Sequence, residues 1–125
     1  MTNFDELIDK YFAILNETDG ERRRELIKQV WTEDGKFVSP FAKVEGHAEI
    51  DAQVQRGQEQ LPPGTEVRRT GDIDVLQDNY VRFSFEAAQP GSEASIGGVD
   101  FGIIVDEKLQ VVAGFFDFAP NPANQ

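Results

Sequence analysis

One acidic residue in this sequence stands where acids rarely do. Asp100 lies in the segment Gly97–Val105, in which every other residue is glycine or apolar. If this segment is a strand, Asp100 shares a face with Gly98, Gly102 and Ile104, and neither face is polar. A carboxyl group in such surroundings has to be paired, protonated or placed at the wall of a cavity. The glycines leave volume unfilled, so the segment predicts a pocket holding one acid; the alternative is a shifted strand with Asp100 at its solvated end.

A tyrosine is the second candidate for chemistry. Apolar residues recur at helical spacing near the start of the chain, at Phe4, Leu7, Ile8, Tyr11, Phe12 and Leu15. Asn3 followed by Glu6 is typical of a helix N-terminus. Tyr11 is therefore expected to point inward, either toward the pocket or as a core tyrosine whose hydroxyl is satisfied.

The elements that would position these two residues follow from periodicity and turn residues. Helices are expected over about 3–15, 21–32 and 47–60, with a short strand at 36–39 and a return at 41–45. Long strands are expected over 65–77, 80–89, 95–105 and 109–118. Helices followed by strands favour an α+β fold with one domain over 1–125 and an ordered core over about 3–118. Three helices packed in a curved, mostly antiparallel sheet would form a cone with an open end that suits a ligand.

Aromatic residues would supply the walls of that cone. The large ones are expected in the core, and some of them at the cavity: Trp31, Phe41, Phe83, Phe85, Phe115 and Phe116. Ligand pockets are mostly apolar, so the predicted substrate-binding set is Trp31, Ser39, Phe41, Phe83, Phe85 and Phe116.

Composition limits the possible partners. A net charge of −11 argues against nucleic acid or an anionic membrane surface, and Arg22–Arg24 is expected to be a solvated cluster. The chain has no cysteine and one histidine, His47, so disulfides, thiolate metal sites and histidine-rich metal sites are excluded. His47 is expected at the surface, with a role at the pocket rim as the alternative. The N-terminus resembles no signal peptide and no run is long enough to span a bilayer, so a cytoplasmic location is expected.

Five short segments carry a resemblance to a known family: Tyr11–Asn16 with Asp19, Val30–Phe37, Val44–Gly46 with Ile50, Val99–Phe101 and Val111–Phe116. In this order and spacing they resemble the nuclear transport factor 2-like superfamily, and within it the SnoaL-like polyketide cyclases and the ketosteroid isomerases. The resemblance covers about Phe4–Asp117. It implies a cone-shaped α+β barrel, a small hydrophobic ligand, no metal or organic cofactor, and a homodimer. The apolar set Val99, Phe101, Ile103 and Val105 would need such a partner as cover.

The resemblance also implies roles for individual residues. Tyr11 and Asp100 match the oxyanion-hole tyrosine and the protonated aspartate of the steroid isomerases, which would both donate hydrogen bonds to an enolate oxygen. The isomerase base, an aspartate before a proline, is replaced here by Ser39 before Pro40. A neutral serine accepts no carbon-bound proton unless a base adjoins it, so steroid isomerase activity is disfavoured.

Three possibilities remain open at this stage, and the first is an enzyme of cyclase or isomerase type that acts on a carbonyl or polycyclic compound. In the SnoaL-like cyclases an acid in the cavity is the proposed acid/base of an aldol-type ring closure, and Asp100 matches it, with Glu45 as a reserve base. The related limonene epoxide hydrolases use two aspartates and an arginine, for which Arg82 and Asp74 are among the available residues. The other readings are a non-catalytic module that binds a hydrophobic ligand and a dimeric structural subunit with a filled cone.

Overall fold

The structure, a computed structural model, describes residues 2–118 and contains three helices and seven strands. The helices are α1 (Phe4–Asn16), α2 (Gly20–Val30) and α3 (His47–Gln60). The strands are β1 (Trp31–Ser39), β2 (Ala42–Glu45), β3 (Glu66–Arg69), β4 (Asp74–Leu76), β5 (Tyr80–Ala88), β6 (Ile96–Val105) and β7 (Lys108–Phe118). The predicted α+β class with three N-terminal helices is confirmed. None of the helices in the described chain is long and apolar enough to cross a membrane.

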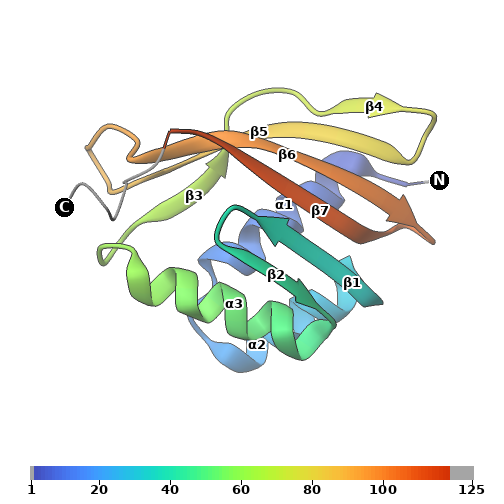
Figure 1. The fold of residues 1–125 in the computed structure, drawn as a ribbon, viewed down its shortest axis with the longest axis horizontal. Coiled ribbons are helices and arrows are strands. Elements are labelled where there is room, and N and C mark those ends of the chain that lie inside the picture. Colours follow the sequence, from blue (N-terminus) through green and yellow to red (C-terminus); the bar gives the residue numbers. More distant parts are fainter. Residues whose placement is uncertain (1, 119–125) are drawn as a thin grey trace.

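One curved sheet holds all the strands in the order β2-β1-β7-β6-β5-β3, with β4 also paired to β5. Every pairing is antiparallel except β1 with β7, which is parallel. The sheet is therefore mostly antiparallel, as expected, but it does not close into a full barrel. Figure 1 shows the helices gathered on one side of the long strands β5, β6 and β7. Their apolar faces and the facing side of the sheet form the core.

Side-chain caps fix where the first two helices begin. The Asn3 side chain accepts a hydrogen bond from the Glu6 amide at 3.0 Å, so the expected cap of α1 is confirmed. The Asp19 side chain accepts from the amides of Glu21 and Arg22 at the start of α2. Such caps satisfy amide groups that have no partner inside the helix. The Asn3 cap sets the start of α1 about two turns before Tyr11.

The structure corrects two predicted boundaries. The second helix ends at Val30 rather than at residue 32, and Trp31 already has extended backbone and begins β1. Trp31 pairs with Leu109 of β7, and its ring covers Gly35, where a Cβ atom would lie 2.6 Å from the ring. The single strand expected over 65–77 is also wrong, because it is divided into β3 and β4 around Gly71. Each of the two short strands pairs with a different part of β5.

A buried ion pair joins α2 to α3. Arg23 is only 3% exposed, so the prediction of a solvated cluster is wrong for this member of the arginine run. Its Nε lies 2.5 Å from Asp51 on α3, and Nη1 donates to the Glu17 carbonyl at 3.0 Å and to Gln58 Oε1 at 3.3 Å. Gln58 in turn donates to the carbonyls of Leu15 and Glu17. This network fastens α3 to the end of α1 and so fixes one wall of the cavity described below.

Candidate functional site

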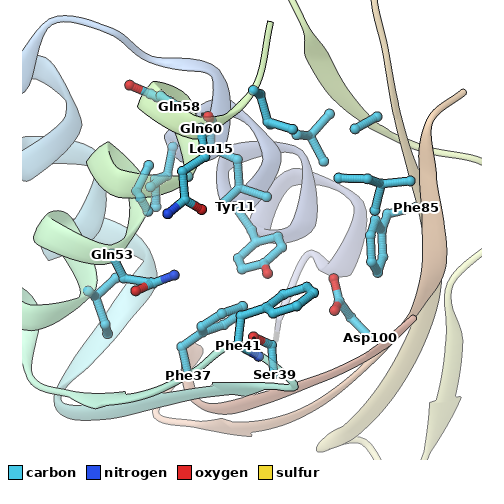
Figure 2. Close-up of a pocket in the computed structure, with 18 of the residues that line it drawn as sticks. Tyr11, Leu15, Phe37, Ser39, Phe41, Gln53, Gln58, Gln60, Phe85 and Asp100 are labelled. Atoms are coloured by element: carbon cyan, nitrogen blue, oxygen red, sulfur yellow. Dashed lines mark hydrogen bonds between the residues drawn. The ribbon is translucent and has the colours of Figure 1, made fainter. Parts of the chain in front are cut away.

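A cavity of about 240 Å³ lies between the helices and the inner face of the sheet. This volume is somewhat below the usual range for ligand sites, about 300–1,000 Å³, so the cavity suits a small ligand. Its walls come from α1, α3 and strands β1, β3, β5, β6 and β7. The lining residues are mostly apolar, and the polar ones among them are Tyr11, Ser39, Gln53, Gln58, Gln60 and Asp100. Figure 2 shows the Tyr11 hydroxyl and the Asp100 carboxyl facing each other across this space.

Strand β6 carries Asp100 to the cavity wall. Asp100 is 3% exposed and points to the same face as the buried residues Gly98, Gly102 and Ile104, as the alternation predicts. Its partner on β7 is Gly114, and a Cβ atom there would lie 2.8 Å from Asp100 Oδ1. A larger residue at this position would therefore push the carboxyl group away from where it lies. The alternative of a shifted strand with Asp100 in solvent is therefore wrong.

Helix α1 carries Tyr11, which aromatic neighbours hold in place. Tyr11 is 2% exposed, and its ring centroid lies 5.4 Å from that of Phe12, 5.6 Å from Phe83 and 6.2 Å from Trp31. The contacts with Phe12 and Phe83 are edge-to-face, a favourable geometry for aromatic pairs. These rings pack around Tyr11, whose hydroxyl faces the Asp100 carboxyl (Figure 2).

Burial controls the protonation of both groups. It raises the pKa of Asp100 from 3.8 to about 7, and the hydrogen bond from the Tyr11 hydroxyl opposes part of this increase. Burial also raises the pKa of Tyr11 well above 10.0, with further contributions from the Asp100 charge and the hydrogen bond between the two side chains. Near neutral pH, Tyr11 is therefore a neutral donor and Asp100 is divided between its acid and its carboxylate form. A carboxyl poised in this way can give and take a proton at physiological pH.

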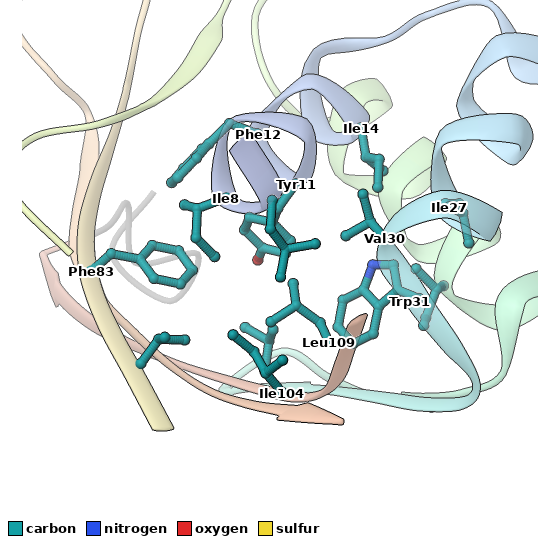
Figure 3. Packing of buried hydrophobic residues seen from close by; sticks show 14 of the residues in the cluster. Ile8, Tyr11, Phe12, Ile14, Ile27, Val30, Trp31, Phe83, Ile104 and Leu109 are labelled. Carbon is teal, nitrogen blue, oxygen red and sulfur yellow. The ribbon is translucent and has the colours of Figure 1, made fainter. Parts of the chain in front are cut away.

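The structure places most of the predicted ligand-contacting residues at the cavity. Trp31, Ser39, Phe41, Phe85 and Phe116 all line it. Phe83 does not, because it is buried in the core against Tyr11 and Phe12 (Figure 3). It supports the Tyr11 ring and is the partner of Asp100 on β5.

Two predicted core residues are exposed instead. Phe41 is 63% exposed at the β1–β2 turn, where its ring still contacts Phe116 at 5.3 Å beside the cavity. Phe115 is 60% exposed on the outer face of the sheet. The residues considered as other catalytic groups also lie away from the cavity. The reserve base Glu45 is exposed on β2 and does not line the cavity, and Arg82 pairs with Asp74 on the surface.

His47 was expected either at the surface or at the pocket rim, and the structure shows a different contact. Its Nε2 lies 3.1 Å from the Trp31 carbonyl and 3.0 Å from the Thr32 carbonyl. Because both partners are acceptors, Nε2 carries the proton and donates to them. The half-buried His47 joins the start of α3 to the start of β1 and does not line the cavity.

Comparisons with known proteins agree with this geometry. Neither a set of protein-family models nor the curated proteins gives a match. Among solved structures, a protein described as an isomerase of the SnoaL-like family from Agrobacterium tumefaciens str. C58 superposes with a TM-score of 0.83. It is 31% identical, over 90% of this chain and 95% of that one. The chain belongs to the SnoaL-like family.

Two more distant structures share the fold of this SnoaL-like chain, and they bear on the fold alone. One is described as a ketosteroid isomerase from Kribbella flavida DSM 17836, with a TM-score of 0.64, 23% identity, and coverage of 94% of this chain and 79% of that one. The other is described as a SnoaL-like polyketide cyclase from Jannaschia sp. CCS1, with a TM-score of 0.65, 15% identity, and coverage of 90% and 86%.

Sequence reasoning missed the contribution of α3 to this SnoaL-like site. Gln53 lines the cavity, and its Oε1 accepts from Arg56 Nε at 3.2 Å and from Arg56 Nη2 at 2.7 Å. Since Arg56 occupies the oxygen, the Gln53 amide nitrogen is left as the group that points toward the cavity (Figure 2). The available signal was the spacing of Ile50, Gln53, Val54 and Gly57, which marks one helix face that mixes apolar and amide residues.

Proposed function

We propose that this protein is an enzyme that acts on a small apolar carbonyl or polycyclic compound by enolate chemistry, of cyclase or isomerase type. One observation carries the proposal: a buried carboxyl with a pKa of about 7 faces a neutral phenol at the wall of an apolar cavity. As a proton leaves the carbon next to a carbonyl group, negative charge develops on the oxygen. Tyr11 is a donor placed to stabilise that charge, and Asp100 becomes a second donor once its carboxylate has taken the proton.

The identity of residue 39 favours ring closure over isomerisation. Ser39 lines the cavity, and its hydroxyl accepts a hydrogen bond from the Phe41 amide at 3.2 Å. Among the described residues at the cavity wall, Asp100 is the only carboxylic acid. In an aldol-type ring closure the Asp100 carboxylate takes the α-proton, the enolate carbon bonds to a second carbonyl carbon, and Asp100 returns the proton to the new alkoxide. One carboxyl group therefore completes the cycle without a second base.

The test of this function is a direct assay with simple ketones. We expect the protein to exchange the α-protons of 1-tetralone in D₂O and to close 2,6-heptanedione to 3-hydroxy-3-methylcyclohexanone, both followed by NMR. Tyr11→Phe should lower the rate by about 10²-fold because it removes one of two donors to the oxygen. Tyr80→Phe is the matched control, since Tyr80 is the half-exposed tyrosine on β5 and does not line the cavity.

A second candidate is a non-catalytic module that holds a hydrophobic ligand, and Ser39 in place of a base is the observation that favours it. In that case ketones would bind saturably, and neither exchange nor ring closure would exceed the rate in buffer. Wild-type protein and Tyr11→Phe would then give the same background rate, which would reject the enzymatic proposal.

We also propose that the protein forms a homodimer through the outer face of its sheet. Val99, Phe101 and Ile103 on β6 pair with Phe115, Ala113 and Val111 on β7, so their side chains form one apolar patch facing away from the helices. Phe101 and Phe115 are both exposed. Apolar patches of this kind are typical of interfaces.

Phe115→Asp tests the dimer. We expect wild-type protein to elute with about twice the chain mass of 14.0 kDa in size-exclusion chromatography with light scattering, and Phe115→Asp to elute as a monomer. Ala48→Asp adds the same charge at an exposed position of α3 and should leave the dimer intact. A monomeric wild type, or a dimer that survives Phe115→Asp, would contradict the proposed interface.

A further inference from the structure

Among residues 2–118, no positively charged side chain is a partner of the Asp100 carboxyl. Among the described residues that line the cavity, only Tyr11 and Asp100 titrate, and none is lysine, arginine or histidine. Buried carboxylates are normally paired with a cation, because an unpaired charge is costly to remove from water. The carboxylate form of Asp100 is therefore an unbalanced negative charge in an apolar space.

Aromatic rings form much of the wall around this charge. Tyr11, Trp31, Phe37, Phe41, Phe85 and Phe116 all line the cavity. Figure 2 shows the rings of Tyr11, Phe41 and Phe85 around the Asp100 carboxyl. Aromatic faces attract organic cations through their negative quadrupole, and rings grouped around a carboxylate are a recurrent way of binding substituted ammonium groups.

The same wall does not suit a metal ion. Calcium and magnesium take six or more oxygen ligands, and zinc takes about four nitrogen, sulfur or oxygen ligands. The cavity offers one carboxyl group, and nowhere among residues 2–118 do three or more acidic, histidine or cysteine side chains come together to hold a metal. The cation that fits has to be organic and small enough for about 240 Å³.

We propose that the cavity binds a small organic ammonium cation, with the Asp100 carboxylate as its counter-ion and the surrounding aromatic rings as its walls. This goes beyond the proposed function, because it requires no reaction. The net charge of −11 also favours a cationic ligand, since a strongly negative protein attracts cations and repels anions.

Binding of a fixed cation is coupled to the protonation of Asp100. Asp100 shares the cavity wall with Tyr11 from α1, Ser39 from β1, Phe85 from β5 and Phe116 from β7. Its strand partners are Phe83 on β5 and Gly114 on β7, and of all these only Tyr11 titrates. Because the pKa of Asp100 is about 7 in the empty cavity, a cation bound at lower pH has to displace its proton. Affinity therefore rises with pH up to about 7, by at most about tenfold per pH unit, and is constant above it.

Choline and 3,3-dimethylbutan-1-ol give the decisive comparison, because they have the same shape and differ in one positive charge that does not titrate. We expect isothermal titration at pH 8 to show that the wild type prefers choline by about tenfold or more. The preference should decrease between pH 7 and pH 5. Asp100→Asn should remove both the preference and its pH dependence while the affinity for the neutral alcohol stays the same.

Aromatic variants keep the test decisive if Asp100→Asn does not fold. Phe41→Leu removes a ring from the cavity and should lower choline affinity several-fold more than it lowers alcohol affinity. Phe115→Leu is the matched control, because Phe115 is similarly exposed but lies on the outer sheet face. A wild type that binds choline no more tightly than the alcohol, or an Asp100→Asn variant that keeps the preference, would overturn the proposal. Ketone turnover is measured separately, so either idea can fail without the other.

Discussion

Asp100→Asn is expected to lower ketone turnover by about 10²–10⁴-fold, the usual contribution of a general acid–base group. Asparagine has nearly the same shape and also donates a hydrogen bond, but its amide neither gives nor takes a proton near neutral pH. The variant removes the proton transfer and keeps the packing against Gly114 and Tyr11. The measurement is kcat for ring closure of 2,6-heptanedione, together with the Kd of an uncharged ketone.

Comparing the change in kcat with the change in Kd identifies the role of the Asp100 carboxyl group. If Asp100 performs chemistry, kcat falls and the Kd of the uncharged ligand changes little. Asp117→Asn provides the control, because Asp117 is an exposed acid near the end of β7 and does not line the cavity. Unchanged turnover in Asp100→Asn would reject the acid/base role, and a parallel loss of affinity and turnover would assign Asp100 to binding alone.

The two central side chains could be placed from sequence because each lies in a strongly periodic segment. Alternation along β6 put Asp100 on the face of Gly98 and Gly102, and that face is buried. Helical spacing put Tyr11 on the inner side of α1. These patterns depend only on local geometry, so they survive folding unchanged.

The register between β6 and β7 could not be predicted in the same way. The strands leave their turn with Val105 opposite Lys108 and Ile104 opposite Leu109, but the next pair is Ile103 with Val111. This irregularity changes the partner of Asp100 to Gly114, which is what leaves space for the carboxyl group. No local pattern marks the irregularity, because packing of the whole sheet decides where a bulge falls.

The polar wall of the cavity was missed for a related reason. The inward face of α3 contains Gln53 and Gln58, so its apolar periodicity is weak, as expected where a helix borders a cavity rather than a filled core. Arg23 looked like part of a solvated run, but Asp51, 28 residues later in the chain, pairs with it. Pairings over such distances are tertiary, and one sequence gives no sign of them.

The stability of the protein should depend on pH through Asp100, and this is the second large effect. The pKa of Asp100 is about 7 in the folded protein and about 3.9 in an unfolded chain. Between these values the folded state holds a proton that the unfolded state has released, so the free energy of unfolding falls as pH rises. The contribution is complete below about pH 4 and is lost above about pH 7, with a total size of about 4 kcal/mol.

Urea unfolding of the wild type and Asp100→Asn at pH 5 and pH 8 measures this contribution. All other titrating groups are common to the two proteins, so their effects cancel in the difference between the two free energies of unfolding. We expect the free energy of unfolding of the wild type to fall by about 3 kcal/mol relative to that of Asp100→Asn from pH 5 to pH 8. The fall takes place over the two pH units between pH 5 and the folded pKa of about 7, at about 1.4 kcal/mol per unit. A difference that stays constant from pH 5 to pH 8 would mean that Asp100 ionises as an ordinary exposed acid. The carboxylate would then be a weak base at the pH where the protein works, and the acid/base role proposed for Asp100 would lose its physical basis.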